Sequence, residues 1–202
     1  MACAVILAGG RSARSGVQHK SCRKVPDDAR TWIDRQVDRL EHAGFAPIIV
    51  VTGYRPRRVH LCLHRRVTLR HHFKAGEGPF STLQRALQNM RKPVLVVQTD
   101  TVLPSVSDLQ RLRRVMQNKT IAAANMVNDR GRGGHPLILS VFMARNLREL
   151  PCTNSDARLD RQLNYLSSEQ YIRLKGRIDH SFSRLDTQRE WCSARIRTRR
   201  LP

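Results

Sequence analysis

The residues best suited to chemistry lie within the first twenty positions of the chain. Two glycines, Gly9 and Gly10, follow an apolar run, and Ser12, Arg14 and Lys20 come soon after them. Paired glycines let backbone N–H groups approach an anion closely, while a hydroxyl and cationic side chains supply further contacts. This combination indicates a loop that binds phosphate groups.

Residue spacing separates this loop from two common phosphate-binding motifs. A Walker loop has four residues between its glycines and a lysine directly after the second, whereas Gly10 and Gly16 enclose Arg11 to Ser15 and are followed by Val17. A dinucleotide fingerprint, G-x-G-x-x-G, does not occur here either. The alternative is a turn that binds no ligand, but such a turn has no need of Ser, Arg and Lys at these spacings.

The segment LAGGRSARSG, with a lysine four residues later, resembles the signature loop of the MobA-like nucleotidyltransferases, L-A-[GA]-G-x-S-x-R-x-G followed shortly by Lys. The matching residues are Leu7, Ala8, Gly9, Gly10, Ser12, Arg14, Gly16 and Lys20. The resemblance implies that this loop holds a nucleoside triphosphate. It also implies that Arg14 and Lys20 bind its phosphates and take part in catalysis.

Two aspartates are candidate ligands for a divalent cation. Asp100 follows an apolar run, where a central strand would emerge at the ligand-binding edge of a sheet. It resembles the family's D-x-P motif, although Val102 replaces the proline. Asp186 resembles the second Asp of the closing D-I-D-T-P-E-D motif, with Arg184 and Gln188 as departures. The resemblance implies Mg²⁺ between Asp100 and Asp186; by itself, the second motif is only a helix-capping pattern.

Two further segments resemble parts of the family's binding site. GEGPFSTLQRAL predicts a helix capped by Ser81, and its resemblance implies that Ser81 and Thr82 bind the base or ribose. GRGGHPLILS resembles a segment of the cytidylyltransferase-like members, in which His135 orients the acceptor. The alternatives are an ordinary capped helix for the first segment and a structural turn residue for His135.

Alternating strand and helix patterns predict an α/β fold. Strands are expected at 4–8, 48–52, 67–69, 94–97, 119–129, 137–139, 171–176 and from Ile178 onward, and helices at 32–43, 56–63, from Ser81, from Ser107 or Asp108, at 142–150 and at 159–168. The resemblance implies a three-layer α/β/α sandwich with a mostly parallel, Rossmann-like sheet of the nucleotide-diphospho-sugar transferase type. We expect one domain over residues 1–202, binding NTP up to about residue 105 and the acceptor beyond it, with a frayed basic tail at 196–202.

Composition limits the remaining possibilities. There is no apolar stretch of 18 residues and no secretory signal at the start, which predicts a cytoplasmic protein without a membrane partner. The cysteines are odd in number and widely spaced, which suggests buried or incidental thiols rather than a zinc site or a disulfide framework. Four histidines between residues 60 and 72 lack a clean metal-binding spacing, so packing or solvated histidines are favoured over a metal cluster.

The chain is strongly basic. Its 37 Lys and Arg against 16 Asp and Glu give a formal net charge of +21, and most of the excess is arginine spread along every segment. A nucleic-acid site would concentrate charge on one face among aromatic residues, which form only 5% of the chain. The charge therefore favours a compositional bias, with nonspecific attraction to nucleic acid and to anionic substrates.

The expected function is Mg²⁺-dependent transfer of an NMP unit from GTP or CTP to a phosphorylated small molecule of the molybdopterin type, with release of pyrophosphate. This would place the protein, as a monomer or weak dimer, in molybdenum cofactor biosynthesis. Two alternatives remain: a catalytically lapsed nucleotide-binding or regulatory protein on the same fold, favoured by the departures at Val102, Arg184 and Gln188, and a basic nucleic-acid-binding protein, favoured only by charge.

Overall fold

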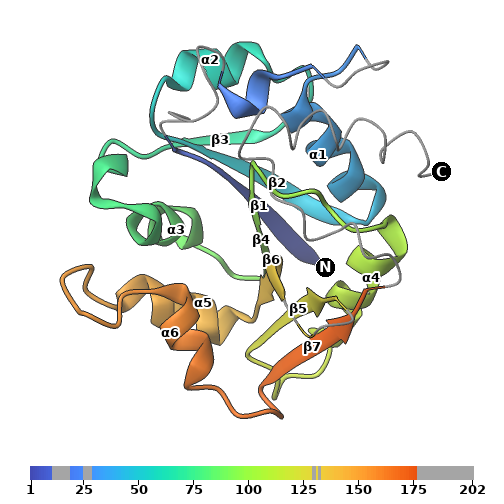
Figure 1. Cartoon of the computed structure of the whole chain (residues 1–202), viewed down its shortest axis with the longest axis vertical. Helices are drawn as coiled ribbons and strands as arrows, with labels where there is room; N and C mark the ends of the chain where they lie inside the picture. Colours follow the sequence, from blue (N-terminus) through green and yellow to red (C-terminus); the bar gives the residue numbers. More distant parts are fainter. Residues whose placement is uncertain (11–18, 25–28, 129–130, 132, 177–202) are drawn as a thin grey trace.

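The computed structural model describes residues 1–10, 19–24, 29–128, 131 and 133–176 (Figure 1). Its strands are β1 (Ala2–Ala8), β2 (Phe45–Thr52), β3 (Thr68–His71), β4 (Val94–Gln98), β5 (Ala123–Val127), β6 (Gly133–Leu139) and β7 (Tyr171–Lys175). Its helices are η2 (Lys20–Cys22), α1 (Trp32–His42), α2 (Pro56–Leu61), η3 (Ala75–Glu77), α3 (Pro79–Leu87), α4 (Val106–Val115), α5 (Val141–Glu149) and α6 (Leu159–Asn164).

The strands form one seven-stranded sheet in the order β3-β2-β1-β4-β6-β5-β7. All neighbouring strands run parallel except β6, which is antiparallel to both β4 and β5. Helices cover both faces of this sheet (Figure 1). The predicted α/β fold with a mostly parallel sheet is therefore confirmed.

Alternate residues of the central strands supply the two halves of the core. On β1, Ala4 and Ile6 belong to the cluster that packs against α1 and α4, whereas Cys3 and Val5 belong to the cluster that packs against α3 and α5. Successive side chains of a strand point to opposite faces, so a strand covered on both sides must be apolar at nearly every position. This requirement explains the unbroken apolar run that opens the chain.

The starts of α3 and α4 differ from their predicted positions. Gly78 is the N-cap of α3 and Pro79 its first residue, so Ser81 lies inside the helix and does not cap it. Ser105 caps α4 by accepting a hydrogen bond from the backbone N–H of Asp108, so this helix begins at Val106. In both cases a residue slightly upstream is able to begin the helix: proline suits the first helical position, and serine is a strong cap.

No helix in the described part of the chain has the length and apolar character needed to cross a membrane.

Candidate functional site

Three segments, two of which carry predicted site residues, meet at one edge of the sheet. Gly9 follows β1, Gly53 follows β2 and Asp100 lies two residues beyond β4. These strands are parallel neighbours with β1 in the middle, so their carboxyl ends lie side by side. The chain winds outward in opposite directions on the two sides of β1, and ligands of open α/β sheets bind at such a switch point.

Lys20 and Asp100 form the charged centre of this edge. The Lys20 Nζ atom lies 3.6 Å from Oδ2 of Asp100, and the two side chains are 10% and 18% exposed. The other carboxylate oxygen, Oδ1 of Asp100, is buried and has no hydrogen-bond partner among the described residues. One oxygen thus contacts a cation, while the second is left for a further positive group.

His19 joins the glycine loop to the helix that carries Lys20. Its Nδ1 accepts a hydrogen bond from the backbone N–H of Ser21, and its Nε2 lies 3.3 Å from the carbonyl oxygen of Gly10. A carbonyl can only accept, so these contacts require a neutral ring with the proton on Nε2. Burial is the main cause that lowers the pKa of His19, with the charges of nearby cations adding to it, and this favours the neutral form.

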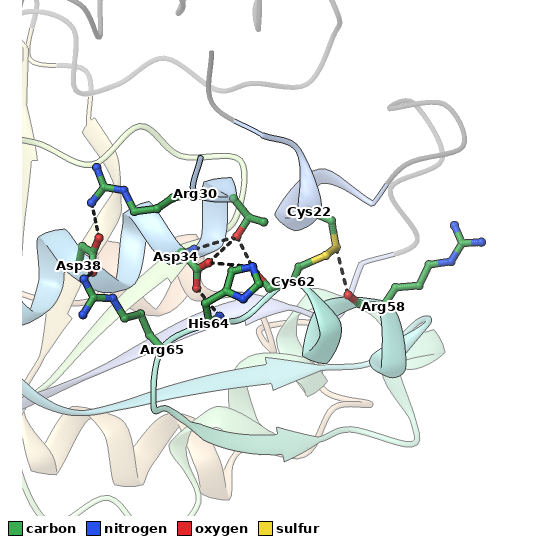
Figure 2. Close-up of polar contacts among 9 residues, drawn as sticks. Cys22, Arg30, Asp34, Asp38, Arg58, Cys62, His64 and Arg65 are labelled. Atoms are coloured by element: carbon green, nitrogen blue, oxygen red, sulfur yellow. Dashed lines mark hydrogen bonds and ion pairs between the residues drawn. A yellow bond between two sulfur atoms is a disulfide. The ribbon is translucent and has the colours of Figure 1, made fainter. Parts of the chain in front are cut away.

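A disulfide fixes the other end of the same short helix. Cys22 in η2 is bonded to Cys62 at the end of α2, and Cys22 Sγ also lies 3.2 Å from the carbonyl oxygen of Arg58 (Figure 2). The prediction of unpaired thiols is therefore wrong for these two residues. Cys3 and Cys152 are free thiols, and Cys192 lies outside the described residues.

The segment after the disulfide is tied in turn to the start of α1. Thr31 donates its hydroxyl hydrogen to the carbonyl oxygen of Cys62. The backbone N–H of His64 donates to the buried carboxylate of Asp34 (Figure 2). The next acidic residue of α1, Asp38, lies between Arg30 and Arg65. The disulfide and these polar contacts thus tie together η2, the segment after α2 and the first half of α1.

A cavity of about 830 Å³ opens beside this edge, on the face of the sheet covered by α3. Residues of both halves of the chain line it, among them Leu7, Phe80, Leu83, Gln98, Asn125, Gly133, Gly134, His135, Leu137, Arg158, Tyr171 and Arg173. Gly133 leaves room for a neighbour here, since a Cβ on it would lie 2.5 Å from Nδ2 of Asn125. The cavity is large enough for a small organic ligand.

The remaining predicted residues differ in whether they line this cavity. His135 lines the cavity, and its Nδ1 lies 3.1 Å from the carbonyl oxygen of Val96, which fixes the ring against β4. Ser81 and Thr82 are buried, and both hydroxyls donate to the carbonyl oxygen of Gly78. Thr82 also supports the glycine loop, because a Cβ on Gly9 would lie 3.2 Å from its methyl carbon.

Several predictions fall outside the described part of the chain, namely those for Ser12, Arg14, Gly16, Asp186, the edge strand from Ile178 onward and the tail at 196–202. Within the described part, no group of three or more His, Cys, Asp or Glu side chains is placed to hold a metal ion. Of the two predicted carboxylate ligands, only Asp100 lies among the described residues. The pairing of Asp100 with Asp186 stays a prediction.

Sequence comparison identifies one domain family. Residues 4–169 match the family model described as the MobA-like NTP transferase domain. No curated protein matches the chain.

Solved structures share the fold along the whole chain. A nucleotidyl transferase from Methanothermobacter thermautotroptrophicus, Mth528, has a TM-score of 0.80 at 18% identity, covering 99% of this chain and 98% of its own. The Rv0371c homologue of Mycobacterium sp. strain JC1 has a TM-score of 0.79 at 20% identity, covering 100% and 98%. Rv0371c of Mycobacterium tuberculosis H37Rv in complex with manganese has a TM-score of 0.70 at 18% identity, covering 95% and 97%.

Proposed function

This chain belongs to the MobA-like NTP transferase family, and on that basis we propose that it transfers an NMP unit from GTP or CTP to a phosphorylated small molecule of the molybdopterin type, releasing pyrophosphate. A nucleotidyltransferase must bring two phosphate-bearing substrates together. Most of its work is therefore neutralising charge and aligning reactants.

One observation carries the proposal. The ion pair of Lys20 and Asp100 lies at the carboxyl edge of the sheet, beside the loop that begins at Gly9. A lysine on this side of the loop supplies positive charge to a triphosphate. A carboxylate facing that lysine is suited to a second cation, which the phosphates of the substrate would share.

The residues of this edge fit a divalent metal ion. Oδ1 of Asp100 is a hard oxygen ligand that is buried without a hydrogen-bond partner among the described residues. Asp100, with Asp186 as the proposed second ligand, would hold Mg²⁺, which when bound polarises a phosphoryl oxygen and orients the triphosphate. The manganese complex of Rv0371c, a protein of the same fold, supports a metal of this class.

The chain's own residues supply binding and alignment. The N–H groups of the loop at Gly9 and Gly10, together with Leu7, Ala8, Ser12 and Gly16, would hold the triphosphate, while Arg14 and Lys20 bind its phosphates. Neutral His19 keeps Gly10 and Lys20 in one rigid unit. An acceptor phosphate oxygen then attacks the α-phosphorus, and the bond from the α-phosphorus to the leaving pyrophosphate breaks.

The cavity beside the edge is the proposed site for the base and for the acceptor. Its first half, at Leu7 and Phe80, adjoins the start of α3, where Ser81 and Thr82 would help to bind the base or ribose. Its second half includes His135, whose ring is fixed against β4 and is therefore suited to orient the acceptor.

The first test is to identify the nucleotide. Gly9 favours GTP by its resemblance to the guanylyl members, while the segment around His135 favours CTP. Thermal denaturation should be followed with GTP, CTP, ATP or UTP in the presence of Mg²⁺, because a ligand that binds only the folded state raises the melting temperature. We expect the largest shift with GTP or CTP; equal shifts with all four nucleotides, or none, would contradict the proposed specificity.

The second test is the substitution Asp100→Asn. With the nucleotide identified and an acceptor that supports turnover, pyrophosphate release should fall by about a hundredfold or more, because a preorganised charge-stabilising group is lost. Glu149→Gln makes the same chemical change in an exposed carboxylate at the end of α5 and should leave turnover unchanged. Full Mg²⁺-dependent turnover of the Asp100 variant would refute the role of Asp100.

A further inference from the structure

Helix α1 donates hydrogen bonds to the loop that carries Asp100. Nε1 of Trp32 donates to the carbonyl oxygen of Thr99 at 2.6 Å. Nε2 of Gln36 donates to the carbonyl oxygens of Gln98 at 3.3 Å and Thr101 at 3.0 Å. These acceptors lie on both sides of Asp100, so α1 holds its backbone from either end.

The same face of α1 continues this contact farther along the loop. Nη1 of Arg39 donates to the carbonyl oxygen of Leu103 at 2.8 Å. Trp32, Gln36 and Arg39 follow one another at helical spacing, so they project from one side of the helix. They form a row of donors, which we call the α1 donor row, facing the loop from residue 98 to residue 103.

Gln36 is the central member of this row. Its side chain is 3% exposed, in a helix whose inward face is otherwise mostly apolar. A buried amide is costly unless its hydrogen bonds are made. Both N–H groups of this amide are used on the loop, whereas its buried oxygen Oε1 has no hydrogen-bond partner among the described residues. An apolar residue would satisfy the core equally well, so the amide points to a requirement of the loop.

We propose that Gln36 is a positioning residue that holds the carboxylate of Asp100 for the divalent metal ion. The proposal rests on the proposed function, in which Asp100 is a metal ligand. Residues that orient a ligand from behind typically contribute about 10- to 100-fold to metal affinity or activity. Gln36 acts in this way through the backbone of the loop, without touching the metal or the substrates.

The test measures binding of Mn²⁺ alone to the purified full chain, by the electron paramagnetic resonance signal of the free ion. Gln36→Met keeps an unbranched side chain of similar length but removes both donors. We expect its Mn²⁺ affinity to fall about tenfold or more. Turnover of this variant should fall through kcat, while KM for the nucleotide changes little, because the triphosphate loop is untouched.

Gln84→Met is the matched control. Nε2 of Gln84 also donates to a set of carbonyl oxygens, those of Leu147, Arg148 and Leu150, but it ties α3 to the end of α5, away from Asp100. Both variants should have a lower melting temperature than the wild type. Only Gln36→Met should lose Mn²⁺ affinity; an equal loss in both variants, or in neither, would overturn the positioning role.

Two further variants test the positioning role of Gln36 independently of Gln36→Met. Trp32→Phe removes the donor to Thr99 together with part of the buried indole ring, and it should also weaken Mn²⁺ binding. It replaces Gln36→Met if that variant does not fold; unchanged affinity would overturn the proposal. Asp100→Asn separates the two hypotheses. If it binds Mn²⁺ as tightly as the wild type, the metal-ligand role given to Asp100 in the proposed function fails, whereas loss of binding in Asp100→Asn alone overturns only the positioning role.

Discussion

At the scale of single residues, the site depends on polar groups whose protonation and hydrogen bonds are set by their neighbours. His19 must be neutral to donate to Gly10 while accepting from Ser21, and burial lowers its pKa accordingly. The charges of Arg55 and Arg58 lower it further. This edge of the sheet is therefore rich in positive charge, as the binding of a triphosphate requires.

Gly53 shows how closely the backbone is packed at this edge. A Cβ on it would lie 2.7 Å from the carbonyl oxygen of Gly9 and 2.5 Å from Cβ of Ala75. We expect Gly53→Ala to displace the glycine loop and raise KM for the nucleotide by about tenfold or more, because small displacements of positioned groups cost large factors. Steady-state kinetics with the preferred NTP would measure this.

The control for that prediction is Gly76→Ala. Gly76 has no atom within 4 Å of an added Cβ, and no positive φ, so alanine fits there without strain. KM should remain at the wild-type value in this variant. A Gly53→Ala enzyme with equally unchanged KM would show that the loop tolerates the displacement.

At the scale of elements, the site is built from segments that follow neighbouring parallel strands. β1 leads into the loop and η2, and β2 leads into α2, so Cys22 and Cys62 meet although 40 positions separate them. Their bond fixes η2, which also carries Lys20. Disulfides are rare in the reduced cytosol, so the redox state of the surroundings would decide whether this link is present.

Opening the disulfide should destabilise the protein. For a loop of 40 residues, the chain-entropy model gives about 3 to 4 kcal/mol, because the cross-link restricts the unfolded chain. We expect reductant to lower the free energy of unfolding of the wild type by roughly this amount, measured by urea denaturation.

The double variant Cys22→Ser/Cys62→Ser serves as the reference for this experiment. Its stability should match that of the reduced wild type and should not respond to reductant, since the described free thiols Cys3 and Cys152 form no bond. Equal stability of the oxidised and reduced wild type would contradict a structural role for the disulfide.

At the scale of the whole molecule, charge is the dominant property. A net charge of +21 attracts any polyanion, including nucleic acid, without a specific interface. In the described part of the chain, many arginines instead serve the fold: Arg70, for example, donates to the carbonyl oxygens of Arg85, Ala86 and Gln88 at the end of α3. This use of arginine fits a compositional bias better than a nucleic-acid site.

The salt dependence of DNA binding distinguishes a compositional bias from a nucleic-acid site. We expect the affinity for a random DNA duplex to fall about a hundredfold or more between about 50 mM and 200 mM salt, with no preference for sequence. Turnover with the nucleotide should change much less, because the partly buried Lys20–Asp100 pair is weakly screened. DNA binding that survives 200 mM salt and depends on sequence would revive the nucleic-acid hypothesis.

The sequence alone determined the fold class and the position of the Gly9-Gly10 turn at the end of the first strand. Apolar runs record burial, so the strands from Ala2 to Ala8 and from Val94 to Gln98 were predictable to within two residues. The Gly9-Gly10 pair was recognisable because it directly follows such a run, and Asp100 because it comes two residues after the second strand. Helix starts were less certain at α3 and α4, where two nearby residues could each begin the helix.

The tertiary structure decided which distant residues meet. The Cys22–Cys62 bond, the contact of Lys20 with Asp100 and the α1 donor row all join segments 40 or more positions apart in the sequence. Local patterns record whether a residue is buried or exposed, but not which strand lies beside which. The strand order places the carboxyl ends of the strands at one edge of the sheet. It thereby brings the glycine loop, Lys20 and Asp100 together at that edge.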